Sequence, residues 1–230
     1  VKMRKVVLLI ALMASMVFAK ATILAQVIKI DGNVKLLKAK SIKKKSVELG
    51  AFLYQDDMLI TLSKAKAILM LSDGSKVILD ERSKLKILGK SDLAHEEGKV
   101  YYHIKKRGSK GLKVSTKFAI IGVKGTKFII NAEEGSQGVS LKEGLVGIDS
   151  LQGEFELHKK KEMDEFAAYQ AKINGEFESY KKALQEEFVT YVSSFDLKPG
   201  KSVRFSKNRV DESEDLEKII KDFSAFENFE

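Results

Sequence analysis

Short strands with alternating apolar residues recur along this chain, and each begins just after a glycine. Two clear examples run from Gly98 to Tyr101 and from Gly125 to Ile130. The other segments of this kind begin at Gly32, Gly74, Gly144 and Gly200. Asp73-Gly74 also lies between two apolar runs, and an Asp-Gly pair in that setting is a strong signal for a β-hairpin. We therefore expect a mainly β domain over residues 20–153.

The spacing of these glycines is compatible with two β architectures. Gly98 follows Gly74 by 24 residues and Gly125 follows Gly98 by 27 residues, which suits one coil of a β-solenoid. Strands that start after glycine turns are also typical of an antiparallel β-sandwich. The spacing favours a solenoid-like domain, with a β-sandwich as the alternative. Residues 193–210 resume the same pattern, and we expect them to form returning strands of the same domain.

Residues 1–19 have the layout of a secretory signal peptide. Three basic residues lie within the first five positions, an uncharged run follows over 6–19, and small residues close it in Val17-Phe18-Ala19. The uncharged run is shorter than the roughly 20 residues that a membrane-spanning helix needs. We expect a periplasmic or secreted protein. The alternative is an uncleaved N-terminal anchor, which would then be the expected membrane contact of the chain.

Residues 154–192 show helical periodicity in place of strand alternation. Apolar residues recur every three or four positions, close to a heptad stripe. Asn174-Gly175 could form a turn, but the stripe keeps its phase across the pair, so we predict one long helical insertion. The stripe is either a partner or dimer face, or it packs on its own β domain. The candidate partner-binding residues are Phe166, Ile173, Phe177, Tyr180, Leu184 and Phe188.

The C-terminal residues 211–230 are predicted to form a second helix, which is amphipathic and acidic. The chain as a whole has a formal net charge of +9, but the β segments are basic while residues 154–192 and 211–230 are acidic on balance. Opposite charge predicts that the helices lie on the β domain or on that of a second copy. Few aromatic residues interleave with the lysine clusters, which argues against nucleic-acid binding.

Composition disfavours catalysis and metal binding. The chain has no cysteine, which excludes a thiol nucleophile and a Cys-ligated metal, and its histidines are isolated in sequence. Asp56-Asp57 and Glu96-Glu97 are adjacent carboxylates, and neighbouring residues of a strand point to opposite faces, so neither pair is suited to acid/base catalysis. We predict a protein that is not an enzyme and uses no cofactor or metal.

Several blocks of the sequence resemble the core of the FecR domain family. They are the segment from Asp57 to Thr61, the hairpin Ser72-Asp73-Gly74-Ser75, and the segment from Val123 to Phe128, which is similar to the family's Val-x-Gly-Thr-x-Phe motif. The resemblance covers residues 25–150 and the returning segment 197–205. One departure is Asp56, at a position where the family usually has glycine. The resemblance implies an exported, all-β, solenoid-like domain.

The sequence thus predicts an exported, non-catalytic binding or sensing module of the bacterial cell envelope. Its expected partner is an envelope protein or polysaccharide, and the helical insertion could join copies of the chain into a homo-oligomer. Two alternatives stay open. One is a self-assembling structural protein of the envelope, and the other is a membrane-anchored signalling regulator if the N-terminal segment is not cleaved.

Overall fold

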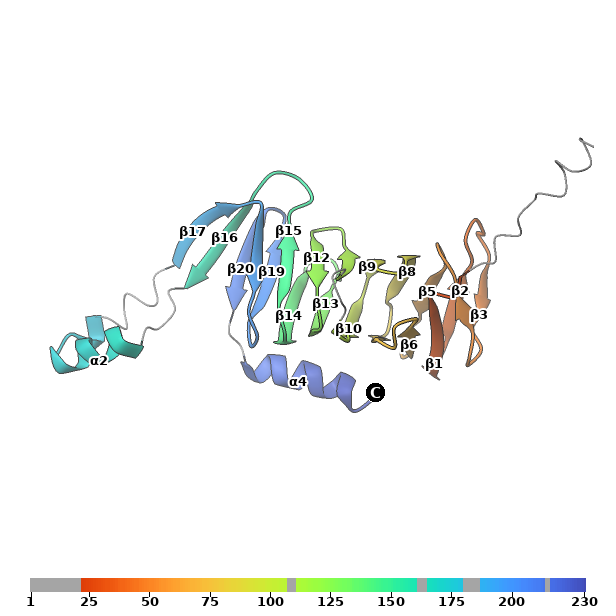
Figure 1. Ribbon diagram of the computed structural model, residues 1–230, viewed down its shortest axis with the longest axis horizontal. Coiled ribbons are helices and arrows are strands. Elements are labelled where there is room, and N and C mark those ends of the chain that lie inside the picture. Colours follow the sequence, from red (N-terminus) through yellow and green to blue (C-terminus); the bar gives the residue numbers. More distant parts are fainter. Residues whose placement is uncertain (1–21, 107–110, 161–164, 180–186, 214–215) are drawn as a thin grey trace, which may run out of the picture.

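Two large β-sheets lie face to face and form an elongated body, with one helix across its side and another at its far end (Figure 1). The computed structural model describes residues 22–106, 111–160, 165–179, 187–213 and 216–230. The predicted signal segment 1–19 lies outside these residues. The described part is mainly β, as predicted.

Sheet A has eleven strands and sheet B has nine. The strands of sheet A, in spatial order, are β17 (Glu187–Val192), β16 (Phe155–Lys160), β20 (Arg209–Ser213), β19 (Ser202–Ser206), β14 (Gly138–Glu143), β13 (Lys127–Asn131), β10 (Lys99–His103), β7 (Lys76–Leu79), β6 (Lys66–Leu71), β1 (Ala25–Asp31) and β4 (Phe52–Leu53). Those of sheet B are β18 (Ser194–Leu197), β15 (Val146–Asp149), β12 (Ile120–Val123), β11 (Leu112–Ser115), β9 (Asp92–Glu97), β8 (Lys84–Gly89), β5 (Met58–Thr61), β2 (Val34–Leu37) and β3 (Lys44–Ser46). The helices are α2 (Glu165–Ile173) and α4 (Leu216–Glu227).

The recurring glycines mark the corners at which the chain passes from one sheet to the other. Gly98 connects β9 in sheet B to β10 in sheet A with a φ of 85°, and an added Cβ would lie 2.8 Å from the carbonyl oxygen of Arg82. The equivalent corners are Gly32, Gly125, Gly144 and Gly200, all with positive φ. Glycine adopts this left-handed conformation at little cost, unlike other residues. Five of the six repeated glycines therefore mark a change of sheet, and Gly74 marks the hairpin between β6 and β7.

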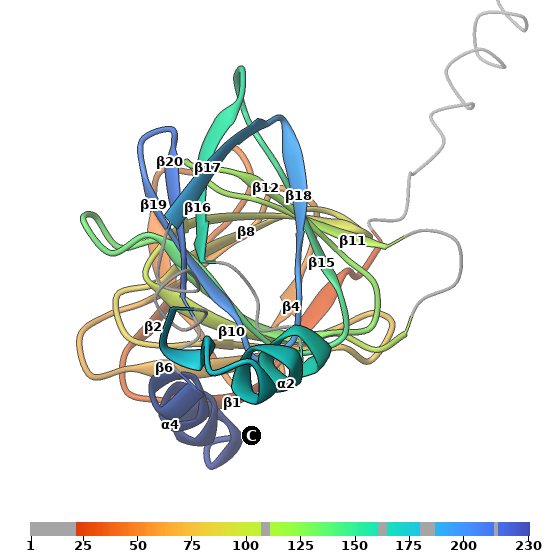
Figure 2. The ribbon, with the colours of Figure 1, turned by 90° about the vertical axis from the view of Figure 1, so that its left-hand side faces the viewer.

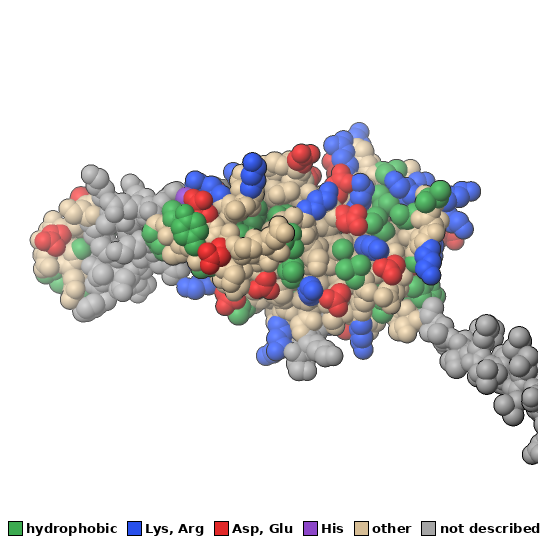
Figure 3. Space-filling model, turned by 90° about the horizontal axis from the view of Figure 1, so that it is seen from above, with side chains coloured by type: hydrophobic (Ala, Val, Ile, Leu, Met, Phe, Trp, Pro, Cys, Tyr) green, Lys and Arg blue, Asp and Glu red, His purple; other side chains and the backbone are tan. Residues whose placement is uncertain are grey.

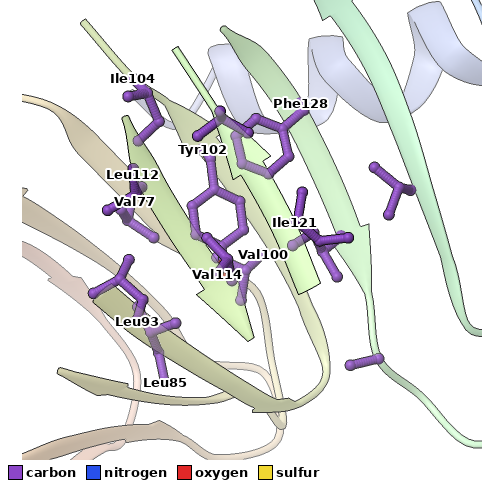
Figure 4. Packing of buried hydrophobic residues seen from close by; sticks show 14 of the residues in the cluster. Val77, Leu85, Leu93, Val100, Tyr102, Ile104, Leu112, Val114, Ile121 and Phe128 are labelled. Carbon is purple, nitrogen blue, oxygen red and sulfur yellow. The ribbon is translucent and has the colours of Figure 1, made fainter. Parts of the chain in front are cut away.

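Apolar side chains from both sheets meet in one continuous core. Tyr102 of β10 and Phe128 of β13 are fully buried and stack with ring centroids 4.7 Å apart. Figure 4 shows them facing residues of sheet B such as Val114 and Leu93. The alternation of buried and exposed positions along the strands follows from the period of two of a β-strand.

The structure does not support the expected solenoid. Coils of a β-solenoid pair their strands in parallel, whereas among the described strands only β9–β11 and β16–β20 pair in parallel. The glycine spacing measures the distance between hairpins and changes of sheet, and this distance can equal that of a solenoid coil. Two antiparallel-rich sheets around one core are closer to the sandwich alternative.

The prediction of one long helix over residues 154–192 is wrong. Phe155–Lys160 and Glu187–Val192 are strands that pair antiparallel as β16 and β17. The helix α2 covers Glu165–Ile173 and ends at Asn174-Gly175, where Gly175 has a φ of 73°. A glycine in this conformation terminates helices. Phe155 and Leu157 are buried with a period of two, a strand signal that the heptad spacing masked.

The C-terminal helix α4 lies against the outer face of sheet A, as charge and amphipathicity predicted (Figure 2). It begins at Leu216, later than the predicted boundary of 211, because Arg209–Ser213 form strand β20. The other acidic segment, around α2, extends beyond the end of the sheets in Figure 1. Only one of the two helices is thus placed on the basic β body.

Candidate partner-binding site

The described part of the segment between β16 and β17, together with β17 itself, carries four of the six candidate partner-binding residues. Phe166 and Ile173 lie on α2, Phe177 follows the turn at Gly175, and Phe188 lies on β17. The exposed fraction is 65% for Ile173 and 44% for Phe188. The predictions for Tyr180 and Leu184 fall outside the described residues. The stretch β16–α2–β17, named here the distal arm, therefore holds these residues without aligning them on one helix face.

Three further apolar residues of the distal arm are exposed and were not among the candidates. They are Tyr169 on α2 and Val189 and Tyr191 on β17. Together with Phe188, the two tyrosines make up three of the four exposed aromatic side chains among the described residues, the fourth being Phe52. Val189 and Tyr191 lie two residues apart on one side of β17, a strand period that the helical spacing does not describe.

The outermost strand of the distal arm, β17, presents an unpaired edge. It pairs only with β16 among the described strands, and its sequence Glu-Phe-Val-Thr-Tyr-Val contains no lysine. The edge strand β3 of sheet B, in contrast, includes Lys44 and Lys45, and the edge strand β4 of sheet A has only two residues. Lysines and short length block strand addition at sheet edges. The fourth edge strand, β18, has four residues, so β17 with six is the longest edge strand among those that the structure describes.

A second apolar surface lies on the outer face of sheet A and is covered by α4. Ile68, Ile78, Tyr101 and Ile129 of adjacent strands β6, β7, β10 and β13 contact Ile219, Phe223 and Phe226 of the helix. The Tyr101 ring stacks on Phe226 with centroids 5.8 Å apart and meets Phe223 edge-on at 5.7 Å. Tyr101 is fully buried by the helix.

Basic side chains of sheet A surround this apolar surface and pair with acids of the C-terminal segment. Lys142 lies 2.7 Å from Glu227, Lys99 lies 3.4 Å from Asp222, and Lys76 lies 2.9 Å from Glu230. Burial alone would raise the pKa of Glu230, but hydrogen bonds from Lys76 and His103 lower it below its usual value. The basic β segments and the acidic C-terminal segment of the sequence thus meet in the structure, where lysines of sheet A form a basic rim around the acidic helix.

The adjacent carboxylates of the sequence have separate structural roles. Asp57 is 2% exposed, accepts the backbone N–H groups of Ala39 and Tyr54, and pairs with Lys38. Asp56 has a φ of 65° and pairs with Lys86 at the surface. In the part of the chain that the structure describes, no three His, Asp or Glu residues are grouped to hold a metal ion. The Asp56–Asp57 pair is therefore part of the turn before β5.

Lysine and arginine side chains are interspersed with acidic ones on the face of the body in Figure 3. The lysines at 44 and 45 lie on the edge strand β3, where they protect the edge of sheet B. This distribution differs from the continuous basic groove that tracks a nucleic-acid backbone. Within the described residues, no helix is long and apolar enough to cross a membrane.

Asp56 and Asp57 thus have structural roles, and exposed apolar side chains gather on the distal arm. Residues 57–147 match the family described as FecR protein, the family that the motifs resemble. The match supports a non-catalytic sensing or regulatory module. Its motif residues build the fold: Gly125 makes a corner and Phe128 stacks in the core. The distal arm and α4 both lie outside the matched segment.

Comparison with solved structures finds two crystal structures of a proposed anti-sigma factor from Parabacteroides distasonis ATCC 8503, at 1.65 and 2.50 Å resolution. Each is 16% identical to this chain, with a TM-score of 0.48, over 71% of this chain. The chain spans 62% of the length of those structures. Comparison with curated proteins gives no match.

Proposed function

We propose that this chain is an exported, non-catalytic binding module of the bacterial cell envelope that binds an extended strand of a partner protein at the edge of β17. The observation that carries the proposal is the open, lysine-free edge of β17 with Phe188, Val189 and Tyr191 exposed on it. Addition of a strand to a free sheet edge gives affinity through main-chain hydrogen bonds, and side chains on alternate positions give specificity. The FecR match and the predicted signal segment 1–19 support the envelope location.

The same edge also favours the second candidate, self-association. Two copies of β17 could pair with each other, which would make the chain an assembling structural protein of the envelope. A polysaccharide partner is less well supported, because main-chain pairing at an edge requires another polypeptide. A signalling regulator anchored through residues 1–19 would use the same surface for its partner.

A matched pair of phenylalanines tests the proposal. Phe188 is 44% exposed on β17 and Phe52 is 43% exposed on β4, at opposite edges of sheet A. Phe188→Asp should reduce partner crosslinking by at least about tenfold, the size expected for a central interface aromatic. Phe52→Asp should leave it unchanged. Both variants should stay folded, since surface substitutions usually change stability by roughly 0.5 kcal/mol or less.

Crosslinking is measured with a photoreactive amino acid in place of Tyr191, in intact cells of the producing bacterium. A protein crosslinked from this position and lost with Phe188→Asp supports a partner at β17. Crosslinks only between copies of the chain, with dimers in sedimentation at low concentration, would favour self-association instead. Equal crosslinking by the Phe188 and Phe52 variants would contradict a role for this edge.

A further inference from the structure

The surface covered by α4 is separate from the main core of the protein. The large cluster between the two sheets contains residues of both sheets and none of α4, whereas Ile219, Phe223 and Phe226 belong to a second cluster on the outer face. No described strand pairs with the segment after Ser213. The sheets are therefore packed and hydrogen-bonded on their inner side without any contribution from α4.

The helix α4 depends on sheet A for its stability. It has 12 residues, and isolated helices of this length are marginal in water. Its last turn contains no basic residue, and Glu227 and Glu230 place negative charge near its C-terminal end, where the helix dipole disfavours anions. Lys142 and Lys76 of sheet A neutralise these two carboxylates. The segment is thus expected to keep its helical conformation only while it is docked on sheet A.

The aromatic contacts of α4 and of the residues after it lie toward the C-terminal end of the chain. Phe223 and Phe226 are buried, Phe229 packs against the same cluster, and Lys29 lies 4.4 Å from the Phe229 ring centroid. Along the earlier turns, a groove of about 550 Å³ runs between the helix and sheet A. Lys218, Asp222, Lys99 and Ser140 are among the residues that line it. The helix leaves this side of the docking surface open.

We propose that the outer face of sheet A is a binding site for an acidic amphipathic helix of a partner protein, which α4 occupies in the free chain. The surface selects such a helix in two ways. An apolar strip of isoleucines with Tyr101 receives aromatic side chains spaced three residues apart, as in Phe223, Phe226 and Phe229. The lysine rim requires acidic side chains on the flanks, as charge complementarity across interfaces does generally. A partner helix binds by displacing α4.

The test uses the full chain and a fluorescent peptide with the sequence of residues 214–230. In the Phe223→Asp/Phe226→Asp variant, α4 no longer competes with the peptide for the outer face of sheet A. The peptide should therefore bind this variant at least about tenfold more tightly than it binds the unaltered chain. A peptide with the same two substitutions should not bind. Raising salt from about 0.05 M to about 0.5 M should weaken binding severalfold, because the lysine rim is screened.

Two results would overturn the proposal. One is a folded Phe223→Asp/Phe226→Asp variant with no gain in peptide affinity. The other comes from hydrogen exchange of the unaltered chain, which does not depend on a variant that folds. If α4 opens independently, its amides exchange faster than those of β7, β10 and β13 beneath it. Exchange of α4 only together with these strands would show that it is an inseparable part of the fold.

Discussion

Replacement of Asp57 by alanine is expected to lower the free energy of unfolding by about 3 kcal/mol, because it removes a buried carboxylate and leaves its donors unpaired. Asp57 accepts the N–H groups of Ala39 and Tyr54 at 3.0 Å each and lies 2.7 Å from Lys38. These bonds join the turn before β5 to the segment that follows β2. Urea unfolding at neutral pH measures the change.

The neighbouring carboxylate provides the control. Asp56 pairs with Lys86 at 3.2 Å, and its side chain is 49% exposed. Asp56→Asn keeps a residue that tolerates the φ of 65°, and loss of a surface ion pair should cost at most about 1 kcal/mol. Equal losses for the two variants would contradict the separate roles assigned to these residues.

Acid is expected to destabilise the protein through His95. This side chain is fully buried on β9, and burial lowers its pKa from 6.5 to about 4. Its Nε2 lies 3.1 Å from the carbonyl oxygens of Glu97 and Gly98, so it donates to them and the ring stays neutral. The unfolded chain takes up a proton near pH 6.5, whereas the folded chain does so only near pH 4. Stability is therefore complete above pH 6.5 and falls by about 3 kcal/mol toward pH 4.

His95→Gln separates this effect from the titration of carboxylates. Glutamine keeps an N–H donor but takes up no proton in this range. The difference in unfolding free energy between the two proteins should therefore change with pH between about 6.5 and 4, whatever the carboxylates contribute to both. A constant difference across this range would show that His95 does not titrate on unfolding. NMR titration of the His95 ring in the folded protein measures its pKa directly.

The sequence predicted the β class, and its recurring glycines coincide with five of the corners, because glycine favours the left-handed backbone found there. Other corners carry no such signal. Lys64 and Arg82 also have positive φ, of 56° and 53°, where the chain changes sheets. Asp56 does so at the position where FecR sequences usually have glycine, so the left-handed backbone is kept despite that departure. A non-glycine residue in this conformation is held by its surroundings, which a single sequence does not reveal.

The distal arm was the least predictable part. Its strands β16 and β17 are separated in sequence by α2, and their pairing is a long-range contact without a local signal. Phe188 was identified as a candidate, although by helical spacing and not by its place on an edge strand. Docking of α4 was predictable, because a short amphipathic helix opposite in charge to the rest of the chain needs such a surface.

The contrast between the edges of the two sheets has a consequence for stoichiometry. If two copies join through β17, the contact is the same on both sides, and a twofold axis relates them. Such a pair closes on itself. The lysines of β3 and the short β4 at the opposite end of the body disfavour the addition of a further strand there. A pair built on β17 therefore occupies this edge on both copies, and a captured partner strand prevents the pairing.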